Sequence, residues 1–145
     1  MFTQKKLLLT GAAGFIGANL ALRLMSSTEP LTVIGLDNVN DYYDVSLKEY
    51  RLRLIEEAAK NNPLVTWRFV RGNIADKTLV ESLFAECHFD IVVNLAAQAG
   101  VRYSITNPDA YIESNLIGFY NILEACRHSF EVYEGGVQHL VYASS

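Results

Sequence analysis

Three glycines near the N-terminus, Gly11, Gly14 and Gly17, follow one another at intervals of three residues. An apolar run at residues 7–9 precedes them, and a helical pattern begins within a few residues. A strand that turns through glycines into a helix directs backbone N–H groups and the positive end of the helix dipole outward, which favours binding of a diphosphate. The spacing is a variant of the dinucleotide-binding pattern G-x-G-x-x-G. Taken alone, the glycines also fit a turn that binds no ligand.

Asp37 strengthens the dinucleotide interpretation. It lies twenty residues after Gly17, at the end of a second apolar run at residues 31–36. An acidic side chain at this distance accepts hydrogen bonds from the ribose hydroxyls of adenosine. Its charge repels a 2′-phosphate, so the sequence favours NAD over NADP. A turn aspartate before Asn38 is the weaker alternative.

The composition excludes several classes of protein. The chain has 145 residues, of which 50% are hydrophobic and 19% charged, as in one globular domain with a substantial core. The net charge of −4 argues against a nucleic-acid surface. Cys87 and Cys126 lack C-x-x-C spacing and are expected to be reduced core residues of a cytoplasmic protein. We expect no membrane span, and His88, His128 and His139 show no metal-ligand spacing.

Hydrophobic periodicity predicts alternating strands and helices. The expected strands are residues 6–10, 31–36, 64–71, 90–95 and 139–143, and the expected helices are residues 15–25, 46–60, 76–87 and 108–127. This alternation predicts an α/β fold, a Rossmann-like doubly wound parallel sheet with helices on both faces, truncated before its last strands. Ligands bind at the carboxyl ends of such strands. Two helices carry regular apolar positions, one with Leu47, Tyr50, Leu54 and Ala58, the other with Ile112, Leu116, Tyr120 and Leu123.

Several motifs resemble those of a known family. They are TGAAGFIG at residues 10–17, DN at 37–38, NLAAQAGVRYS at 94–104, NPDAYIESNLIG at 107–118 and VYASS at 141–145. They resemble extended short-chain dehydrogenase/reductases, in particular the NAD-dependent epimerase/dehydratases, and are most similar to UDP-glucuronate 4-epimerases. The resemblance covers essentially the whole chain, and residues 98–104 are its more specific part.

The resemblance implies an NAD site. Asn73 stands where the family usually has aspartate beside adenine, and its amide oxygen can still accept a hydrogen bond from the adenine amino group. Asn115 either contacts the cofactor or bonds the backbone of a neighbouring strand. The implied cofactor-binding residues are Gly11, Gly14, Phe15, Ile16, Gly17, Asp37, Asn38, Asn40, Asn73, Ile74, Leu95, Ala96, Ala97, Gln98 and Ser114.

The resemblance also implies a catalytic residue. Ser145 aligns best with the family's catalytic serine or threonine, and Ser144 comes next. The family's reaction moves the C4 hydride of a sugar to NAD and back through a 4-keto intermediate, and its base is the tyrosine of a Tyr-x-x-x-Lys pair. No tyrosine in this sequence has lysine four residues later, and after Tyr142 the chain ends before that position. We therefore expect residues 1–145 to be the NAD-binding portion of a longer enzyme, inactive without its substrate-binding portion.

Arg102 is the one basic residue of the specific motif. Its planar guanidinium suits a carboxylate or phosphate of a UDP-sugar substrate, and a solvated loop arginine is an equal alternative. A nucleotide-sugar 4,6-dehydratase or decarboxylase, or a non-catalytic dinucleotide-binding module, are the competing functions. The longer enzyme is a possible homodimer.

Overall fold

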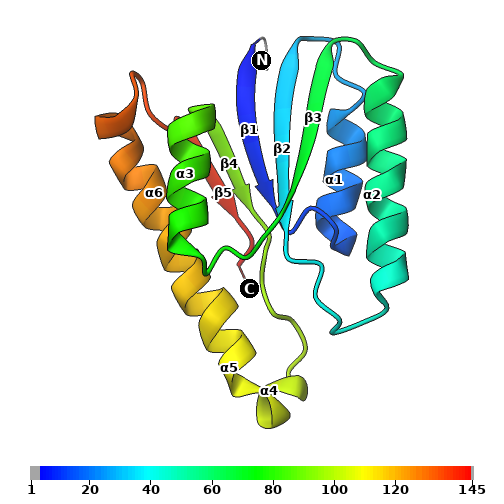
Figure 1. The fold of residues 1–145 in the computed structure, drawn as a ribbon, viewed down its shortest axis with the longest axis vertical. Coiled ribbons are helices and arrows are strands. Elements are labelled where there is room, and N and C mark those ends of the chain that lie inside the picture. Colours follow the sequence, from blue (N-terminus) through cyan, green and yellow to red (C-terminus); the bar gives the residue numbers. More distant parts are fainter. Residues whose placement is uncertain (1–3, 145) are drawn as a thin grey trace.

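The computed structural model describes residues 4–144 and contains a sheet of five parallel strands (Figure 1). The strands are β1 (Lys5–Thr10), β2 (Leu31–Asp37), β3 (Val65–Arg71), β4 (Ile91–Asn94) and β5 (His139–Tyr142). Their spatial order is β3-β2-β1-β4-β5, so the direction of winding changes at β1. Between the carboxyl ends of β1 and its two neighbours lies the crevice in which such sheets bind ligands. The predicted doubly wound parallel sheet is confirmed.

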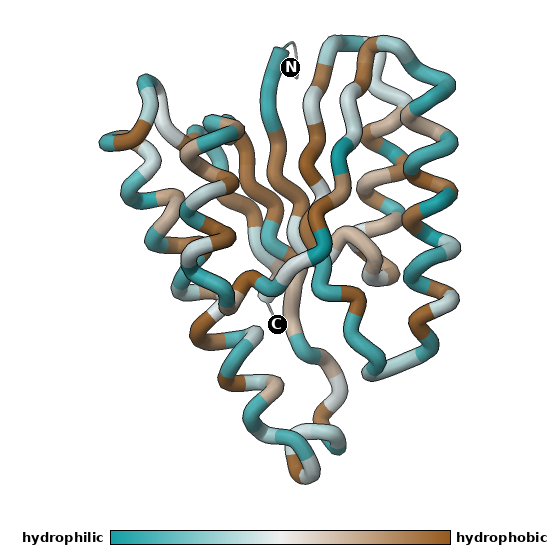
Figure 2. Tube along the Cα trace, viewed as in Figure 1, coloured by the Kyte–Doolittle hydropathy of each residue, from teal (hydrophilic) through white to brown (hydrophobic). Residues whose placement is uncertain are grey.

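Helices cover both faces of this sheet. The helices α1 (Phe15–Leu24) and α2 (Val45–Lys60) pack together on one side, and α3 (Lys77–Cys87) and α6 (Phe119–Val132) on the other (Figure 1). Two clusters of buried hydrophobic residues fill the two interfaces, and the apolar strands stand out between the helices in Figure 2. Successive leucines of β1 alternate between the clusters, because side chains of a strand point to opposite faces of the sheet.

The segment between β4 and α6 differs from the prediction of one helix at residues 108–127. It contains two short helices, α4 (Tyr103–Thr106) and α5 (Pro108–Tyr111), and then a π-helical stretch, η1 (Ile112–Gly118), that leads directly into α6. The helix therefore continues to Val132, beyond the predicted end at residue 127. π-helical turns are rare in proteins, and those that occur are often found at functional sites.

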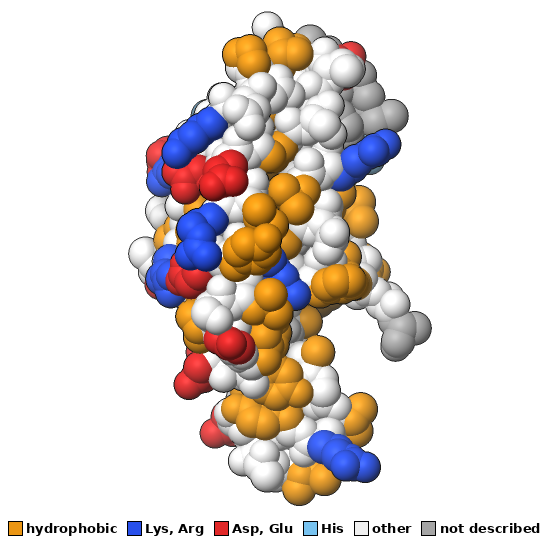
Figure 3. Space-filling model, turned by 90° about the vertical axis from the view of Figure 1, so that its right-hand side faces the viewer, with side chains coloured by type: hydrophobic (Ala, Val, Ile, Leu, Met, Phe, Trp, Pro, Cys, Tyr) orange, Lys and Arg blue, Asp and Glu red, His pale blue; other side chains and the backbone are white. Residues whose placement is uncertain are grey.

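The apolar periodicity located the helices but did not mark their buried faces. In α2 the buried side chains are Lys48, Leu52 and Ile55, whereas Leu47 and Tyr50 are 43% and 50% exposed. On the side of the molecule formed by α1 and α2, hydrophobic side chains accordingly gather in a band beside the charged ones (Figure 3).

The same holds for η1 and α6. Ile112, Leu116, Tyr120 and Leu123 are all exposed, while α6 packs on the sheet and α3 through Ile122, Ala125 and Cys126. The face of α6 that packs against the sheet and α3 is therefore not the face on which the apolar residues repeat in the sequence. Across residues 4–144, no helix combines the length and the apolar character that crossing a membrane requires.

Candidate functional site

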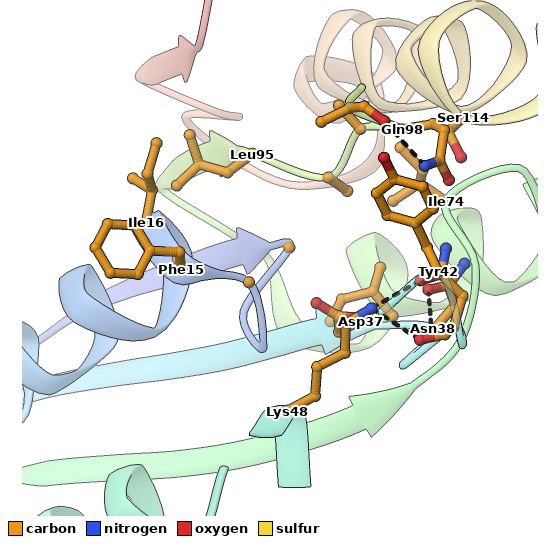
Figure 4. Close-up of a pocket in the computed structure, with 18 of the residues that line it drawn as sticks. Phe15, Ile16, Asp37, Asn38, Tyr42, Lys48, Ile74, Leu95, Gln98 and Ser114 are labelled. Carbon is orange, nitrogen blue, oxygen red and sulfur yellow. Dashed lines mark hydrogen bonds between the residues drawn. The ribbon is translucent and has the colours of Figure 1, made fainter. Parts of the chain in front are cut away.

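A groove with a volume of about 620 Å³ opens at the carboxyl ends of the central strands (Figure 4). This volume falls in the range of sites for small molecules and cofactors. The segment of residues 38–44, here called the β2 loop, and the segment of residues 95–102, here called the β4 loop, both contribute lining residues. The residues predicted to bind the cofactor all line this groove, namely Gly11, Gly14, Phe15, Ile16, Gly17, Asp37, Asn38, Asn40, Asn73, Ile74, Leu95, Ala96, Ala97, Gln98 and Ser114.

The glycine turn brings the start of α1 to the floor of the groove. Gly11 has a φ of +70°, and a Cβ atom on Gly17 would lie 2.0 Å from the carbonyl oxygen of Gly11. Gly14 caps the helix, so the amide groups of Phe15 and Ile16 occupy its first two positions, where a helix provides no acceptor. No acidic residue lies in this first turn. The turn therefore offers free N–H donors and an uncompensated positive dipole end to an anion.

The carboxylate of Asp37 is fixed at the end of β2. One oxygen accepts a hydrogen bond from the backbone N–H of Ala13 at 2.9 Å, and the other accepts from the N–H of Val39 at 2.8 Å. Each carboxylate oxygen has a further lone pair for a ligand hydroxyl. Asp37 thus joins the glycine turn to the β2 loop and still presents acceptors to the groove.

The sequence analysis missed Lys48, whose side chain is only 5% exposed although it lines the groove. Its Nζ donates to the backbone oxygen of Asn40 at 2.9 Å and to the side-chain oxygen of Asn40 at 2.7 Å. The same Nζ lies 4.4 Å from the centre of the Tyr43 ring. Burial lowers the pKa of Lys48, and the nearby charge of Asp37 acts in the opposite direction. No pattern in the sequence distinguishes it, because the apolar positions of this helix mark a face other than the buried one.

Arg51 is a second cation that the sequence analysis missed. Its Nη1 donates to the carbonyl oxygen of Ala13 at 3.1 Å and to the hydroxyl of Tyr43 at 2.8 Å. Its guanidinium carbon lies 5.9 Å from the centre of the Phe15 ring. Arg51 therefore holds α2, the glycine turn and the β2 loop in one arrangement.

Thr10 fixes the beginning of the β4 loop. Its buried hydroxyl donates to the side-chain oxygen of Asn94 at 2.5 Å and accepts from the backbone N–H groups of Leu95 and Ala96, both at 3.1 Å. Buried polar groups require such partners. The threonine was expected only to end the first strand, and no pattern in the sequence distinguishes its second role.

Asn115 resolves one alternative left open by the sequence. Its side-chain oxygen accepts from the backbone N–H of Gln98 at 2.9 Å, and its Nδ2 donates to the Gln98 carbonyl at 3.1 Å. Asn115 thus bonds the backbone of the β4 loop, where the sequence analysis expected either the cofactor or the backbone of a neighbouring strand. Its neighbour Ser114 lines the groove, and both residues lie in η1, so the π-helical stretch faces the candidate site.

Asn73 lies beside Ile74 at the end of β3. Its side-chain oxygen accepts from the N–H of Ala75 at 2.9 Å, and its Nδ2 lies 3.4 Å from Oε1 of Glu113. Because an amide oxygen has two lone pairs, one acceptor position is left for a ligand.

The remaining site predictions lie elsewhere. Arg102 is exposed, precedes α4 and is not among the residues that line the groove. Ser145 lies outside the described residues, although Ala143, two positions earlier, lines the groove. Within residues 4–144 no three His, Cys, Asp or Glu side chains are grouped as metal ligands.

Comparison with known proteins identifies relatives. Residues 8–145 match the family model described as GDP-mannose 4,6 dehydratase. Protein CapI of Staphylococcus aureus is 47% identical over 140 residues, which cover 97% of this chain and 37% of that protein. UDP-glucuronate 4-epimerase 2 of Arabidopsis thaliana is 45% identical over 120 residues, which cover 83% of this chain and 26% of that protein. The chain thus spans well under half of the length of these relatives.

A solved structure shares the fold. UDP-glucose 4-epimerase from Bifidobacterium longum, in complex with NAD⁺ and UDP, superposes with a TM-score of 0.71 and is 26% identical. The match covers 97% of this chain and 37% of that protein.

Proposed function

The chain belongs to the GDP-mannose 4,6 dehydratase family, and from this premise we propose that it forms the NAD-binding part of a nucleotide-sugar 4-epimerase that acts on UDP-glucuronate. The observation that carries the proposal is the placement of Asp37, whose fixed carboxylate lies in one groove with the glycine turn and the start of α1. Donors for a diphosphate and an acceptor for a ribose diol are what a dinucleotide requires. Relatives crystallised with NAD confirm the predicted cofactor.

The residues of the groove divide the binding of NAD among them. The amides of Phe15 and Ile16 hold the diphosphate, and Asp37 and Asn38 hold the adenosine ribose. Asn73 and Ile74 border adenine, and Leu95, Ala96, Ala97 and Gln98 lie along the second ribose. Asn40 and Ser114 complete the lining. When bound, NAD supplies the acceptor and donor of hydride.

The reaction proposed for the whole enzyme is inversion at C4 through a 4-keto sugar. Ser145 hydrogen-bonds the C4 hydroxyl of the sugar, and the base that takes its proton is a tyrosine outside residues 1–145, paired with a lysine. Arg102 binds the carboxylate of the substrate, because its guanidinium is exposed and therefore accessible to a ligand. For the whole enzyme we also predict a homodimer in the cytoplasm.

A 4,6-dehydratase is the second candidate, because the family model that matches the chain is described as a dehydratase. Both reactions begin with the same oxidation at C4 and require the same NAD groove. They differ in the acid and base residues that act at C5 and C6, so the two products separate the candidates.

Product analysis of the full-length protein with UDP-glucuronate tests the proposal. We expect conversion to UDP-galacturonate with no change in mass. UDP-glucose, which keeps a hydroxyl at C6, is assayed in parallel: its conversion to a 4-keto-6-deoxy sugar with loss of water would support a dehydratase, and a pentose product from UDP-glucuronate would support a decarboxylase. The 145-residue chain should show no turnover, and turnover by this chain would contradict the location of the base.

A further inference from the structure

Three tyrosines that follow β2 and β4 meet beside the groove, and Tyr42 lines it. Tyr42 comes from the β2 loop, Tyr103 is the first residue of α4, and Tyr111 is the last residue of α5. The ring centres of Tyr42 and Tyr103 are 4.7 Å apart, and those of Tyr103 and Tyr111 are 6.3 Å apart. These separations fall within the range of favourable aromatic pairs.

The β4 side of this cluster is held in place by hydrogen bonds. The hydroxyl of Tyr111 donates to the carbonyl oxygen of Ala99 at 3.0 Å and also contacts the carbonyl of Gly100. The hydroxyl of Tyr103 accepts from Nδ2 of Asn107 at 2.8 Å. The surface that meets Tyr42 is therefore fixed to the β4 loop.

Gly100 makes room for the ring from the β2 loop. A Cβ atom on Gly100 would lie 2.2 Å from the hydroxyl oxygen of Tyr42, and the φ of Gly100 is +95°, in a region that favours glycine. The backbone of the β4 loop thus fits the tip of Tyr42 closely, which is independent support for a specific contact between the loops.

The cluster spans the path of a bound dinucleotide. The strands β2 and β4 are the two neighbours of β1, so the contact between Tyr42 and Tyr103 joins the segments on either side of the strand that ends in the glycine turn. Tyr42 lines the groove and points from the β2 loop toward Gln98 and Ser114 (Figure 4). A dinucleotide that extends from Asp37 to Gln98 crosses from one of these loops to the other.

We propose that Tyr42 and Tyr103 form a clasp that closes over the bound dinucleotide and slows its release. The proposal rests on the proposed NAD site and adds a kinetic role that the binding residues do not supply. Release requires the ring pair to separate, so the clasp raises the barrier to dissociation. The ring contact, and not the hydroxyl of Tyr42, is the part that does this.

Stopped-flow measurement of NAD dissociation from the 145-residue chain tests the clasp. We expect Tyr42→Ala and Tyr103→Ala each to accelerate dissociation roughly three- to tenfold, the factor that one aromatic pair provides. The double variant should be no faster than either single variant, because both remove the same contact. Tyr42→Phe keeps the ring and should retain slow dissociation. Tyr50→Ala is the matched control, since Tyr50 is 50% exposed on α2 and does not line the groove.

Gly100→Ala provides a test in which no tyrosine is changed. The new methyl group would displace the ring of Tyr42, so NAD should dissociate as fast as from Tyr42→Ala. Dissociation from Tyr42→Ala at the rate of the unchanged chain would overturn the clasp alone. Failure of the unchanged, folded chain to bind NAD would overturn both the clasp and the cofactor assignment.

Discussion

The β2 loop and the β4 loop line the same groove, but different chemistry holds each of them. The β2 loop is secured by charged groups, the carboxylate of Asp37 and the buried ammonium of Lys48, which bond its backbone. The β4 loop is secured by neutral groups, the hydroxyl of Thr10 and the amide of Asn115. The carboxylate of Asp37 lies where a ribose is expected, whereas the neutral groups bond other groups of the protein, namely Asn94 and the backbone of the β4 loop. On the β2 side, Asp37 both holds the loop in place and is available to bind the ligand. On the β4 side, Thr10 and Asn115 hold the loop in place, and other residues of the loop face the ligand.

The largest loss of stability is expected from Thr10→Val. Valine has nearly the same shape but leaves Asn94 without its donor and the N–H of Ala96 without its acceptor. Each buried group left unsatisfied costs about 1–3 kcal/mol, so we expect a loss of about 3 kcal/mol in the free energy of unfolding, measured with denaturant. Thr10→Ser keeps the hydroxyl and should lose less than half as much. A loss in Thr10→Ser as large as that in Thr10→Val would contradict this expectation, because it would show that the methyl group contributes as much as the hydrogen bonds.

Asn115→Ala should cost about 2 kcal/mol, because it removes both bonds to the backbone of Gln98. Hydrogen exchange followed by mass spectrometry should show faster exchange in the β4 loop and unchanged exchange at residues 38–41 of the β2 loop. Asn121 provides a comparison on the same helix, since its Nδ2 donates to the carbonyl of Ile74 and not to the β4 loop. Asn121→Ala should therefore leave exchange in the β4 loop unchanged. Faster exchange throughout the groove in Asn115→Ala would contradict independent support of the two loops.

Lys48→Met should loosen the β2 loop and leave the β4 loop unchanged, with a smaller loss in the free energy of unfolding, about 1 kcal/mol. Methionine fills similar space and avoids the cost of burying a charge, which offsets part of the lost bonding to Asn40. Exchange should increase in the β2 loop, and NAD should bind several-fold more weakly. Lys77→Met is the control, because Lys77 is exposed on α3 and pairs only loosely with Glu81, at 3.8 Å. An unchanged β2 loop in Lys48→Met would remove the charged support from this account.

Tyr43→Phe should have the smallest effect. The hydroxyl of Tyr43 accepts from Arg51 at 2.8 Å, but the contact is exposed, and Arg51 keeps its bond to Ala13. We expect a change of about 0.5 kcal/mol or less, measured by denaturant unfolding. A loss above 1 kcal/mol would mean that Arg51 depends on Tyr43 for its position.

The contrast between the two loops also explains what the sequence could predict. The glycine spacing, the apolar strands and Asp37 are local signals, and they located the alternating strands and helices and the glycine turn with its aspartate. The other predicted lining residues, such as Asn73, Gln98 and Ser114, came from the family resemblance. Lys48 gave no such signal, because lysine is almost never fully buried and its partner Asn40 lies in a loop without periodicity. Thr10 was assigned only to the end of a strand. Its contact with Asn94 could not be predicted from local sequence, because the two positions are 84 residues apart.

The exposed face of η1 and α6 shows a second limit of the sequence. Ile112 and Leu116 repeat at helical spacing, yet they face outward, since packing against β4 and α3 selects other positions. Periodicity reports that a helix has an apolar side, but the neighbours in the fold decide whether that side is covered. The π-helical stretch likewise has no signature in the apolar pattern.

Calorimetric titration of this chain with NAD and NADP tests the central claim most directly. The account predicts that NAD binds more tightly than NADP and that Asp37→Ala weakens NAD binding about tenfold or more, as expected for loss of a charged hydrogen-bond acceptor. Asp41→Ala, in the same loop but not lining the groove, should bind NAD as the unchanged chain does. A folded chain that binds NADP as well as NAD, or an Asp37→Ala variant with unchanged affinity for NAD, would contradict the assignment of this groove.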